Sequence, residues 1–406
     1  MGVSAIGNAL LGIAFWAVAA KAFSPHDLGV MTAVLAVIMS TGVVAATGIG
    51  DSYTALLPAV GDHRPQFYRR GQRLFLVLAA IGATAAGLGT VTLLSEVYGS
   101  IAVGALVAIG TIVWAATTLQ NSTLVALGRA SWLPAANLGL SAGKLALLPL
   151  LAVMISWHPV ELSVVATAVV VVAVLGSRIT RIVDSGEQLP ASTIPGGLSV
   201  RRFYSFVGQT TLSSALTMGL FLVSPFLVTV WSTPSQGALF ALSLSVVQAL
   251  DLLGAALSTS LVVHASSHPD QAAAMARSIL IKAVLLSVVG AALLIAVAPV
   301  ALRLLNPLYG EMGAASVIAT LAVGTICRLV YQVWSALQRA RRKMLAPLAL
   351  TVVSAAVLLL SMPTLCAAHG AVGGAQALLL AQLAMIVGIG IHFLASRNRI
   401  GAVGAG

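Results

Sequence analysis

The sequence predicts an all-α polytopic membrane protein with twelve transmembrane helices in two pseudo-symmetric six-helix lobes and with both termini cytoplasmic. Of the 406 residues, 59% are hydrophobic and only 8% are charged, whereas an ordinary soluble domain carries about 25% charged residues. Apolar stretches of about 20 residues recur along the chain, and each is long enough to cross a hydrocarbon core about 30 Å thick as a helix. The chain also resembles itself at about half its length, which is typical of a duplicated architecture.

The self-similarity is clearest at Phe15–Met31 (FWAVAAKAFSPHDLGVM), which has a degraded copy at Phe226–Ala241 (FLVTVWSTPSQGALFA). In each copy an apolar run ends, a short break contains Pro, and a new apolar run begins. Aligning Gly29 with Gly237 brings the two breaks into register to within a residue or so. Two structurally equivalent halves are therefore expected.

The apolar runs and the Pro and Gly positions between them predict the individual spans. In the first half the predicted spans are Ser4–Ala22, Asp27–Ile49, Leu74–Ser95, Ile101–Ala126, Leu133–Ile155 and Val160–Ile179. In the second half they are Phe203–Val230, Gln236–Val263, Ile279–Leu302, Met312–Leu337, Leu345–Ala367 and Val372–Leu394.

The distribution of Lys and Arg predicts the orientation, because basic residues are enriched in cytoplasmic loops. With the N-terminus inside, two of the 21 basic residues, Lys21 and Arg303, fall in outer loops. Two more, Lys144 and Arg328, lie within spans, and the remaining 17 fall in inner segments. Most of the net charge of +11 is thus explained by topology and contact with a membrane surface, and we expect no nucleic-acid partner.

The longest inner loop predicts the division into domains. We expect an N-terminal six-helix lobe at 1–182, a cytoplasmic linker at 183–202 and a C-terminal six-helix lobe at 203–406. Six spans per lobe leave both lobes in the same orientation, related by an axis along the membrane normal, with a cavity between them. The outer loops are short, and the sequence has no persuasive nucleophile–base set, phosphate-binding Gly loop or metal-ligand grouping. We therefore expect a protein that is not an enzyme and that uses no cofactor or metal.

Charged residues within spans are costly, by about 2.5–3.5 kcal/mol on insertion scales, and they usually face a cavity or a partner. Lys144 is central in its span, and the helical spacing of Asn137, Ser141 and Lys144 puts all three on one face. The functional interpretation is a basic position in a wet cavity that binds an anionic substrate. The alternatives are snorkelling to the interface or an unidentified partner.

The second half contains two further charges in its spans. Arg328 shares a helix face with Gln332, and Asp251 lies at a similar depth in another span. Arg328 is therefore either a second substrate-binding residue or half of a structural ion pair with Asp251, which is also the candidate for ion coupling. The other residues predicted to line the substrate path are Asn8, Gln120 and Lys21. Lys21 has an equally simple alternative as an interfacial anchor.

Two motifs carry a resemblance to a known family. Ala19-Ala20-Lys21-Ala22-Phe23-Ser24-Pro25 is followed by Leu28-Gly29, and Leu127-Gly128-Arg129-Ala130 follows the fourth span. With the twelve-span topology, they make the chain resemble the polysaccharide-exporter branch of the multidrug/oligosaccharidyl-lipid/polysaccharide exporter superfamily.

The resemblance implies a flippase that moves a polyprenyl-diphosphate-linked oligosaccharide across the cytoplasmic membrane of a bacterium by alternating access. That activity would serve assembly of O-antigen, capsule or exopolysaccharide. The implied partners are membrane lipid, the lipid-linked glycan, a polysaccharide polymerase and a chain-length regulator. The main alternative is a cation-coupled multidrug exporter of the same superfamily, for which Asp251 would be the required membrane acid. A major-facilitator transporter is disfavoured because its basic Gly-rich signature is missing from Asp51–Arg73.

Overall fold

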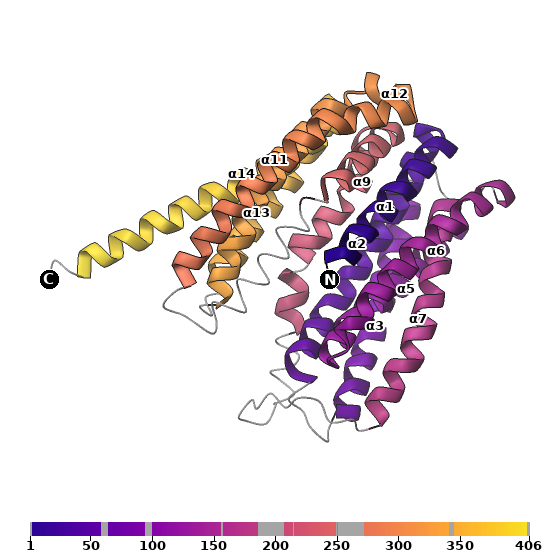
Figure 1. Ribbon diagram of the computed structural model, residues 1–406, viewed down its shortest axis with the longest axis horizontal. Coiled ribbons are helices and arrows are strands. Elements are labelled where there is room, and N and C mark those ends of the chain that lie inside the picture. The colour runs from indigo at the N-terminus through magenta and orange to yellow at the C-terminus, as the bar shows by residue number, and fades with distance from the viewer. Residues whose placement is uncertain are drawn as a thin grey trace. The chain divides into compact units, whose positions relative to one another are not determined.

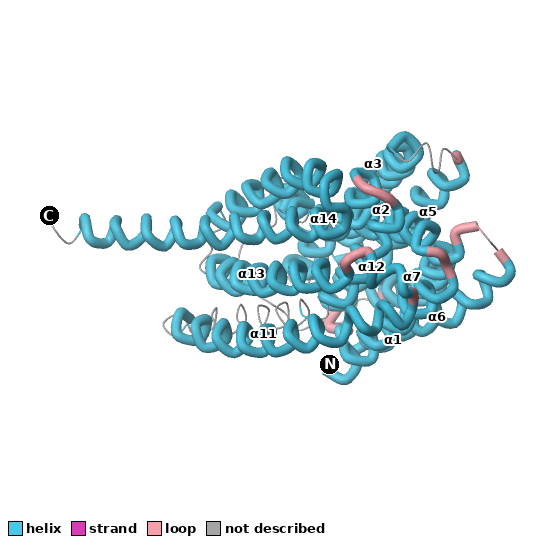
Figure 2. Tube along the Cα trace, turned by 90° about the horizontal axis from the view of Figure 1, so that it is seen from above, coloured by secondary structure: helices cyan, strands magenta, loops and turns pink. Residues whose placement is uncertain are grey.

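The computed structural model describes residues 2–57, 64–93, 100–155, 157–185, 207–213, 215–248, 250, 272–340 and 345–403. Helices account for nearly all of these residues, and no strand occurs among them (Figure 2). The helices divide into two compact units, Met1–Phe226 and Leu227–Gly406. The predicted lobe boundaries stay a prediction, and Asp251 and most of the predicted linker, 186–202, lie outside the described residues.

Unit 1 contains the helices that are indigo to magenta in Figure 1. They are α1 (Gly2–Ala22), α2 (Pro25–Leu56), α3 (Arg64–Leu93), α5 (Ile101–Ala126), α6 (Leu133–Met154) and α7 (Pro159–Asp184). A short 3₁₀ turn, Ala130–Trp132, precedes α6. The unit ends with helix 207–213, the π-helix η4 (Ala215–Gly219) and the start of α9 (Leu220–Trp231), where a continuous span was predicted.

Unit 2 continues from α9 into a helix at 234–248. It then contains α11 (Ala272–Leu305), the short α12 (Pro307–Glu311), α13 (Ala314–Ala340) and α14 (Leu345–Val403). Helix α14 has a left-handed residue, Gly370 (φ 57°), in its interior. Because no α-helix continues through such a backbone, α14 is two helices joined at Gly370, at the boundary predicted between the last two spans.

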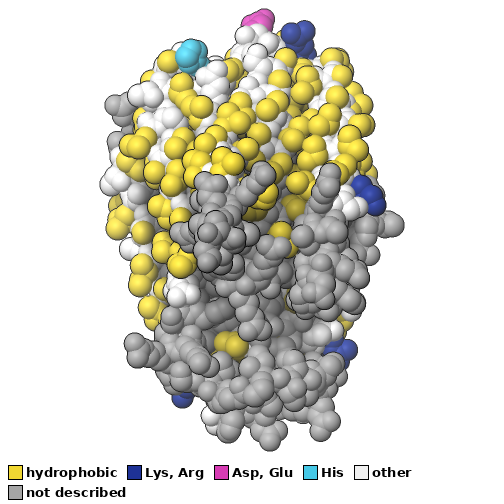
Figure 3. All heavy atoms as spheres, turned by 90° about the vertical axis from the view of Figure 1, so that its left-hand side faces the viewer, with side chains coloured by type: hydrophobic (Ala, Val, Ile, Leu, Met, Phe, Trp, Pro, Cys, Tyr) yellow, Lys and Arg dark blue, Asp and Glu magenta, His cyan; other side chains and the backbone are white. Residues whose placement is uncertain are grey.

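Nine of the described helices are long and apolar enough to cross a membrane, by length and composition. One of them, Leu345–Leu394, has 50 residues, about twice the length that one span needs. Large hydrophobic side chains remain exposed on these helices, such as Leu360 at 79% and Val289 at 67%. On the face drawn in Figure 3, the described side chains are mostly hydrophobic and the few charged ones lie toward its edges. The chain is a multi-pass helical membrane protein, while the count of twelve spans and the orientation stay predictions.

The repeated Pro-containing stretch forms the same helix start in each unit. Ser24 caps α2 by accepting a hydrogen bond from the backbone N–H of Asp27 (3.1 Å), with Pro25 at the first helical position. In unit 2, the Thr233 hydroxyl accepts from the N–H of Gln236 (3.4 Å), and Pro234 follows Thr233 in the chain. Ser24 lies five residues before Gly29 and Thr233 lies four residues before Gly237, so the two caps differ by one residue when the glycines are aligned.

Tight packing between α2 and α5 forms the centre of unit 1. Ile38, Ile49 and Leu119 are buried to within 2% exposure. A Cβ at Gly42 would lie 3.0 Å from the backbone nitrogen of Ala115, so the two helices approach closely only because that residue is glycine. Helix α1 packs mainly against α6, and α6 packs against α7. The interface between α1 and α6 contains the candidate site.

Candidate functional site

Lys144 lies at the interface between α1 and α6. Its ammonium nitrogen is 4.7 Å from the centroid of the Phe15 ring, a cation–π arrangement worth about 0.5–2 kcal/mol depending on desolvation. Phe15 is fully buried, and its ring makes an edge contact with Trp16 at a centroid distance of 5.2 Å. The side chain of Lys144 is thus held by an aromatic face of a neighbouring helix.

A hydrogen bond joins the same two helix faces. The Ser141 hydroxyl donates to the amide oxygen of Asn8, and Ser141 is buried while Asn8 is half-buried. Asn8 and Phe15 are seven residues apart on α1, and Ser141 and Lys144 are three apart on α6, so each pair shares a helix face. The polar face predicted for α6 therefore contacts a face of α1 that combines an amide with an aromatic ring.

The positive charge of Lys144 is not balanced by a carboxylate on either helix. Neither α1 nor α6 contains Asp or Glu, and no described acid forms an ion pair with Lys144. A buried or half-buried cation needs a compensating interaction, and the ring of Phe15 contributes one. An anionic group brought to this interface would pair with Lys144 without displacing a protein carboxylate.

Three further predicted residues of unit 1 lie on α6, α1 and α5. Asn137 is half-buried on α6 one turn before Ser141. Lys21 is exposed in the last turn of α1. The amide nitrogen of Gln120 donates to the carbonyl of Val172 on α7 (2.9 Å), which gives Gln120 a structural bond between α5 and α7. Its own amide oxygen is buried and has no hydrogen-bond partner among the described residues.

In unit 2, Arg328 and Gln332 are both half-buried on α13. The amide oxygen of Gln332 is buried and lacks a hydrogen-bond partner within the described part of the chain. Asp251 lies outside that part, so its proposed pairing with Arg328 stays a prediction.

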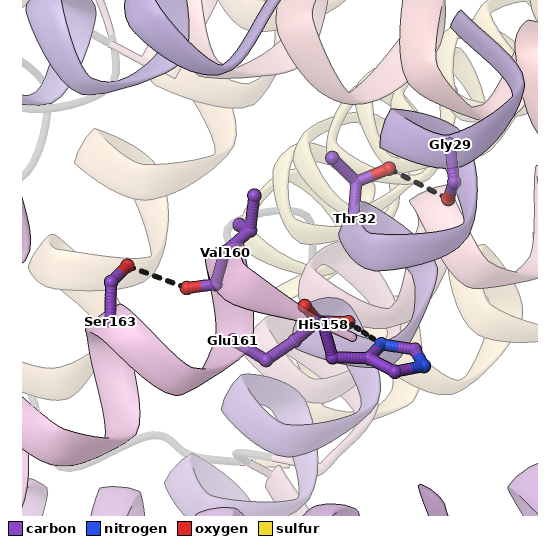
Figure 4. A network of polar contacts seen from close by, with 6 residues as sticks. All are labelled: Gly29, Thr32, His158, Val160, Glu161 and Ser163. Atoms are coloured by element: carbon purple, nitrogen blue, oxygen red, sulfur yellow. Dashed lines mark hydrogen bonds and ion pairs between the residues drawn. The ribbon is translucent and has the colours of Figure 1, made fainter. Parts of the chain in front are cut away.

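A buried ionisable pair at the start of α7 is absent from the sequence-based prediction. The Nδ1 atom of His158 lies 2.8 Å from the Oε1 atom of Glu161, and the two residues are 7% and 0% exposed. Figure 4 shows both side chains at the first turn of α7, with Gly29 and Thr32 of α2 in the same view. Across the described residues, no group of three or more His, Cys, Asp or Glu side chains could hold a metal ion.

The sequence contains faint signals for both features that the prediction missed. Phe15 is seven residues after Asn8, which places it on the polar face of α1. Glu161 follows His158 by three residues at a Pro-marked helix start, the spacing at which a side chain reaches back to the helix cap. His158 lies between the predicted spans Leu133–Ile155 and Val160–Ile179, in a break for which the sequence predicts no side-chain partner.

No protein-family model and no curated protein matches the sequence. Solved structures do match it. A multidrug resistance MATE family transporter of the MOP superfamily, in an inward-facing conformation, superposes with a TM-score of 0.68 at 14% identity, over 98% of this chain and 95% of that one. The lipid II flippase MurJ, in an inward closed conformation, superposes with a TM-score of 0.71 at 12% identity, over 95% of this chain and 86% of that one.

A third similar structure is a MOP superfamily transporter from Pyrococcus furiosus, described as having a binding pocket of reversed polarity that suggests a different function. It gives a TM-score of 0.58 at 15% identity, over 99% of this chain and 93% of that chain. At these identities the likeness concerns architecture and not cargo. The chain has the fold of the MOP superfamily transporters.

Proposed function

We propose that the chain flips a polyprenyl-diphosphate-linked oligosaccharide across the cytoplasmic membrane of a bacterium, for assembly of a cell-surface polysaccharide. Two six-helix lobes would alternate between inward and outward access, and the diphosphate–sugar head would cross through a basic interior while the lipid tail stays in the bilayer. A polysaccharide polymerase and a chain-length regulator are the proposed protein partners.

The observation that carries this proposal is the Lys144 cluster. An ammonium group within a membrane helix, paired with Phe15 and with no carboxylate on its two helices, favours an anionic cargo. A diphosphate presents several strong acceptor oxygens to such a cation. The proposed hydrogen-bonding residues around the head group are Asn8, Asn137, Ser141 and Gln120, with Lys21 at the mouth of the path and Arg328 and Gln332 from the other unit.

The similar structures support a lipid cargo only in part. A lipid II flippase has this fold, which makes a lipid-linked substrate compatible with the architecture. A MATE multidrug transporter has it too. Fold alone leaves the cargo open, and the choice of an anionic glycan lipid rests on the charge at Lys144.

A cation-coupled multidrug exporter is the second candidate. The fully buried Glu161 favours it, because a buried acid within a transmembrane bundle is the kind of group that such an exporter would use to bind a coupling cation or a cationic drug. Asp251 has the same proposed role. The two candidates differ in the charge of the cargo, which makes them separable by experiment.

The test uses the purified full chain in liposomes with three fluorescent probes. These are a polyprenyl-diphosphate-linked disaccharide, the same disaccharide joined to the polyprenyl chain by an uncharged ether, and a cationic dye. We expect transbilayer movement of the diphosphate probe above that in protein-free liposomes, and no such increase for the ether probe. Movement of the dye without movement of the diphosphate probe would contradict glycan flipping and support drug export.

A further inference from the structure

The buried His158–Glu161 pair differs from the ion pair between Arg69 and Asp184 in the same unit. The described ion pair between Arg69 and Asp184 joins side chains that are 71% and 48% exposed at 3.5 Å. The side chains of His158 and Glu161 are 6% and 0% exposed at 2.8 Å. They adjoin Pro159 and Val160, both buried, and the His158 ring makes an edge contact with Trp157 (5.0 Å). Two ionisable groups therefore meet in a dry environment.

The geometry goes beyond what a helix start requires. His158 is the N-cap of α7, yet its side chain makes no capping hydrogen bond and contacts Glu161 instead. Its backbone is left-handed (φ 51°, ψ 45°), a conformation that costs a non-glycine residue energy and that clusters at functional sites. The second oxygen of Glu161, Oε2, is buried with no hydrogen-bond partner among the described residues. Buried polar oxygens are usually hydrogen-bonded in native structures, so this oxygen calls for an explanation.

On the helices around α7, the other ionisable groups are either exposed or lie at a distance from the pair. On α6 the only ionisable residue is Lys144, ten residues before the helix end, or about 15 Å of helical rise away. Helix α5 has none. His26 and Asp27 of α2 lie at the same end of the bundle but are exposed. The remaining ionisable groups of the neighbouring helices lie at the opposite end of the bundle. They are Asp51 and Tyr53 of α2 and Arg64, Tyr68, Arg69, Arg70 and Arg73 of α3. The same end contains Arg178, Arg181 and Asp184 of α7 itself.

A buried pair of His and Glu has a charge balance that suits it to hold one exchangeable proton. With one exchangeable proton the pair is neutral overall, either as imidazolium with carboxylate or as imidazole with carboxylic acid. Losing that proton leaves a buried carboxylate beside a neutral ring, and gaining a second leaves a buried imidazolium beside a neutral acid. Both charged states are unfavourable out of water. A shared proton would therefore be retained while the pair is buried and would exchange if this end of α7 became hydrated.

We propose that His158 and Glu161 form the proton-binding site that couples transport to a proton gradient, at the end of α7 that the predicted topology places outside. The coupling part rests on the proposed transport function, whereas the proton-binding part does not. His and acidic side chains are the groups from which membrane pumps and transporters build proton relays. The pair would take up a proton when it is hydrated and retain it when it is buried. The charge of the site would then depend on the conformation of unit 1.

The experiment compares three variants with the wild-type chain. Glu161→Gln keeps the shape but cannot ionise. His158→Asn removes the titratable ring while tolerating the left-handed backbone. Glu311→Gln, at an exposed acid of α12, is the matched control. Proton binding is followed in the purified chain by infrared difference spectra during a pH titration, and coupling is followed in liposomes by transport of the diphosphate-linked disaccharide probe with and without a pH gradient.

We expect a buried-carboxyl signal in the wild type and in Glu311→Gln that is lost in Glu161→Gln and shifted in His158→Asn. For one proton per cycle, a gradient of one pH unit changes the leaflet distribution of the probe by up to about tenfold. That response should disappear in Glu161→Gln and should persist in the control Glu311→Gln. An unchanged infrared signal in Glu161→Gln, or an unchanged gradient response in it, would overturn the proposal.

Failure of the transport proposal gives a different result. If the wild type does not move the diphosphate-linked probe, glycan flipping is wrong, but the infrared titration still decides whether Glu161 binds a proton. The same gradient measurement with the cationic dye then decides coupling. Transport of either cargo by the wild type that is independent of the gradient would overturn proton coupling.

Discussion

The ammonium nitrogen of Lys144 lies over the ring of Phe15, 4.7 Å from its centroid, and this contact joins α6 to α1. An aromatic ring stabilises a cation without neutralising it. The contact therefore stabilises a positive charge between two membrane helices and leaves that charge able to attract an anion. It also explains how Lys144 is accommodated although neither α6 nor α1 contains an acidic residue.

The Lys144–Phe15 contact predicts a measurable coupling energy. In a double-mutant cycle with Phe15→Leu and Lys144→Met, the two changes should be non-additive by about 0.5–2 kcal/mol of unfolding free energy. Both substitutions keep apolar volume, so the cycle isolates the interaction between charge and ring. Unfolding of the four purified proteins in detergent provides the measurement, and additive effects would show that the ring does not stabilise the charge.

A second prediction concerns the glycine that lets helix 207–213 approach α2. A Cβ at Gly48 would lie 2.1 Å from the Thr211 hydroxyl oxygen and 2.6 Å from the Val207 carbonyl oxygen. Because one of these atoms is backbone, Gly48→Ala should lower the unfolding free energy by about 1–3 kcal/mol. Gly89→Ala is the matched control, since nothing lies within 4 Å of its Cβ. Equal thermal stability of the two variants would rule out the close approach.

A third prediction concerns the bond that fixes the break in α14. The Gln236 amide oxygen accepts a hydrogen bond from the N–H of Ala371 (2.9 Å), next to the left-handed Gly370. Gln236→Ala leaves that N–H without its acceptor, which should speed hydrogen exchange at Ala371 by roughly tenfold. Gln236→Glu retains an acceptor oxygen, so the N–H of Ala371 should exchange slowly in that variant. Equally fast exchange in both variants would mean that the bond does not hold the break.

A fourth prediction separates the two roles of Arg328. If Arg328 binds the diphosphate, Arg328→Ala should slow transport of the diphosphate probe by about 10–100-fold, and a second change, Asp251→Asn, should not restore it. The measurement is probe movement in liposomes alongside the thermal stability of each variant. Recovery of both stability and transport in the double variant would instead identify a structural ion pair.

Hydropathy predicts several of the described helices because a membrane span must be apolar over its own length. The predicted span Ile101–Ala126 coincides with α5. The predicted boundary of a helix is wrong where the helix continues beyond its apolar part. Helix α3 begins at Arg64, whereas the predicted span begins at Leu74. The first turns of α3 contain basic residues, and their hydropathy does not report backbone conformation. The π-helix Ala215–Gly219 was equally invisible, since its composition suits an α-helix.

The candidate site was predictable in part for a similar reason. Helical spacing correctly put Ser141 and Lys144 on one face, but spacing on one helix cannot name the helix that the face contacts. Phe15 was therefore missed, and so was the contact between His158 and Glu161, which depends on a left-handed backbone at a position that carries no glycine.

The central claim is that Lys144 binds the diphosphate of a lipid-linked glycan. Its most direct test is the movement of a polyprenyl-diphosphate-linked disaccharide in liposomes containing the wild type, Lys144→Ala, or Lys282→Ala, in which an exposed lysine of α11 is removed. Lys144→Ala should lower the rate by about 10–100-fold, the range for loss of a charge-assisted contact, while Lys282→Ala stays at the wild-type rate. Equal rates in all three, with equal amounts of inserted protein, would contradict the account.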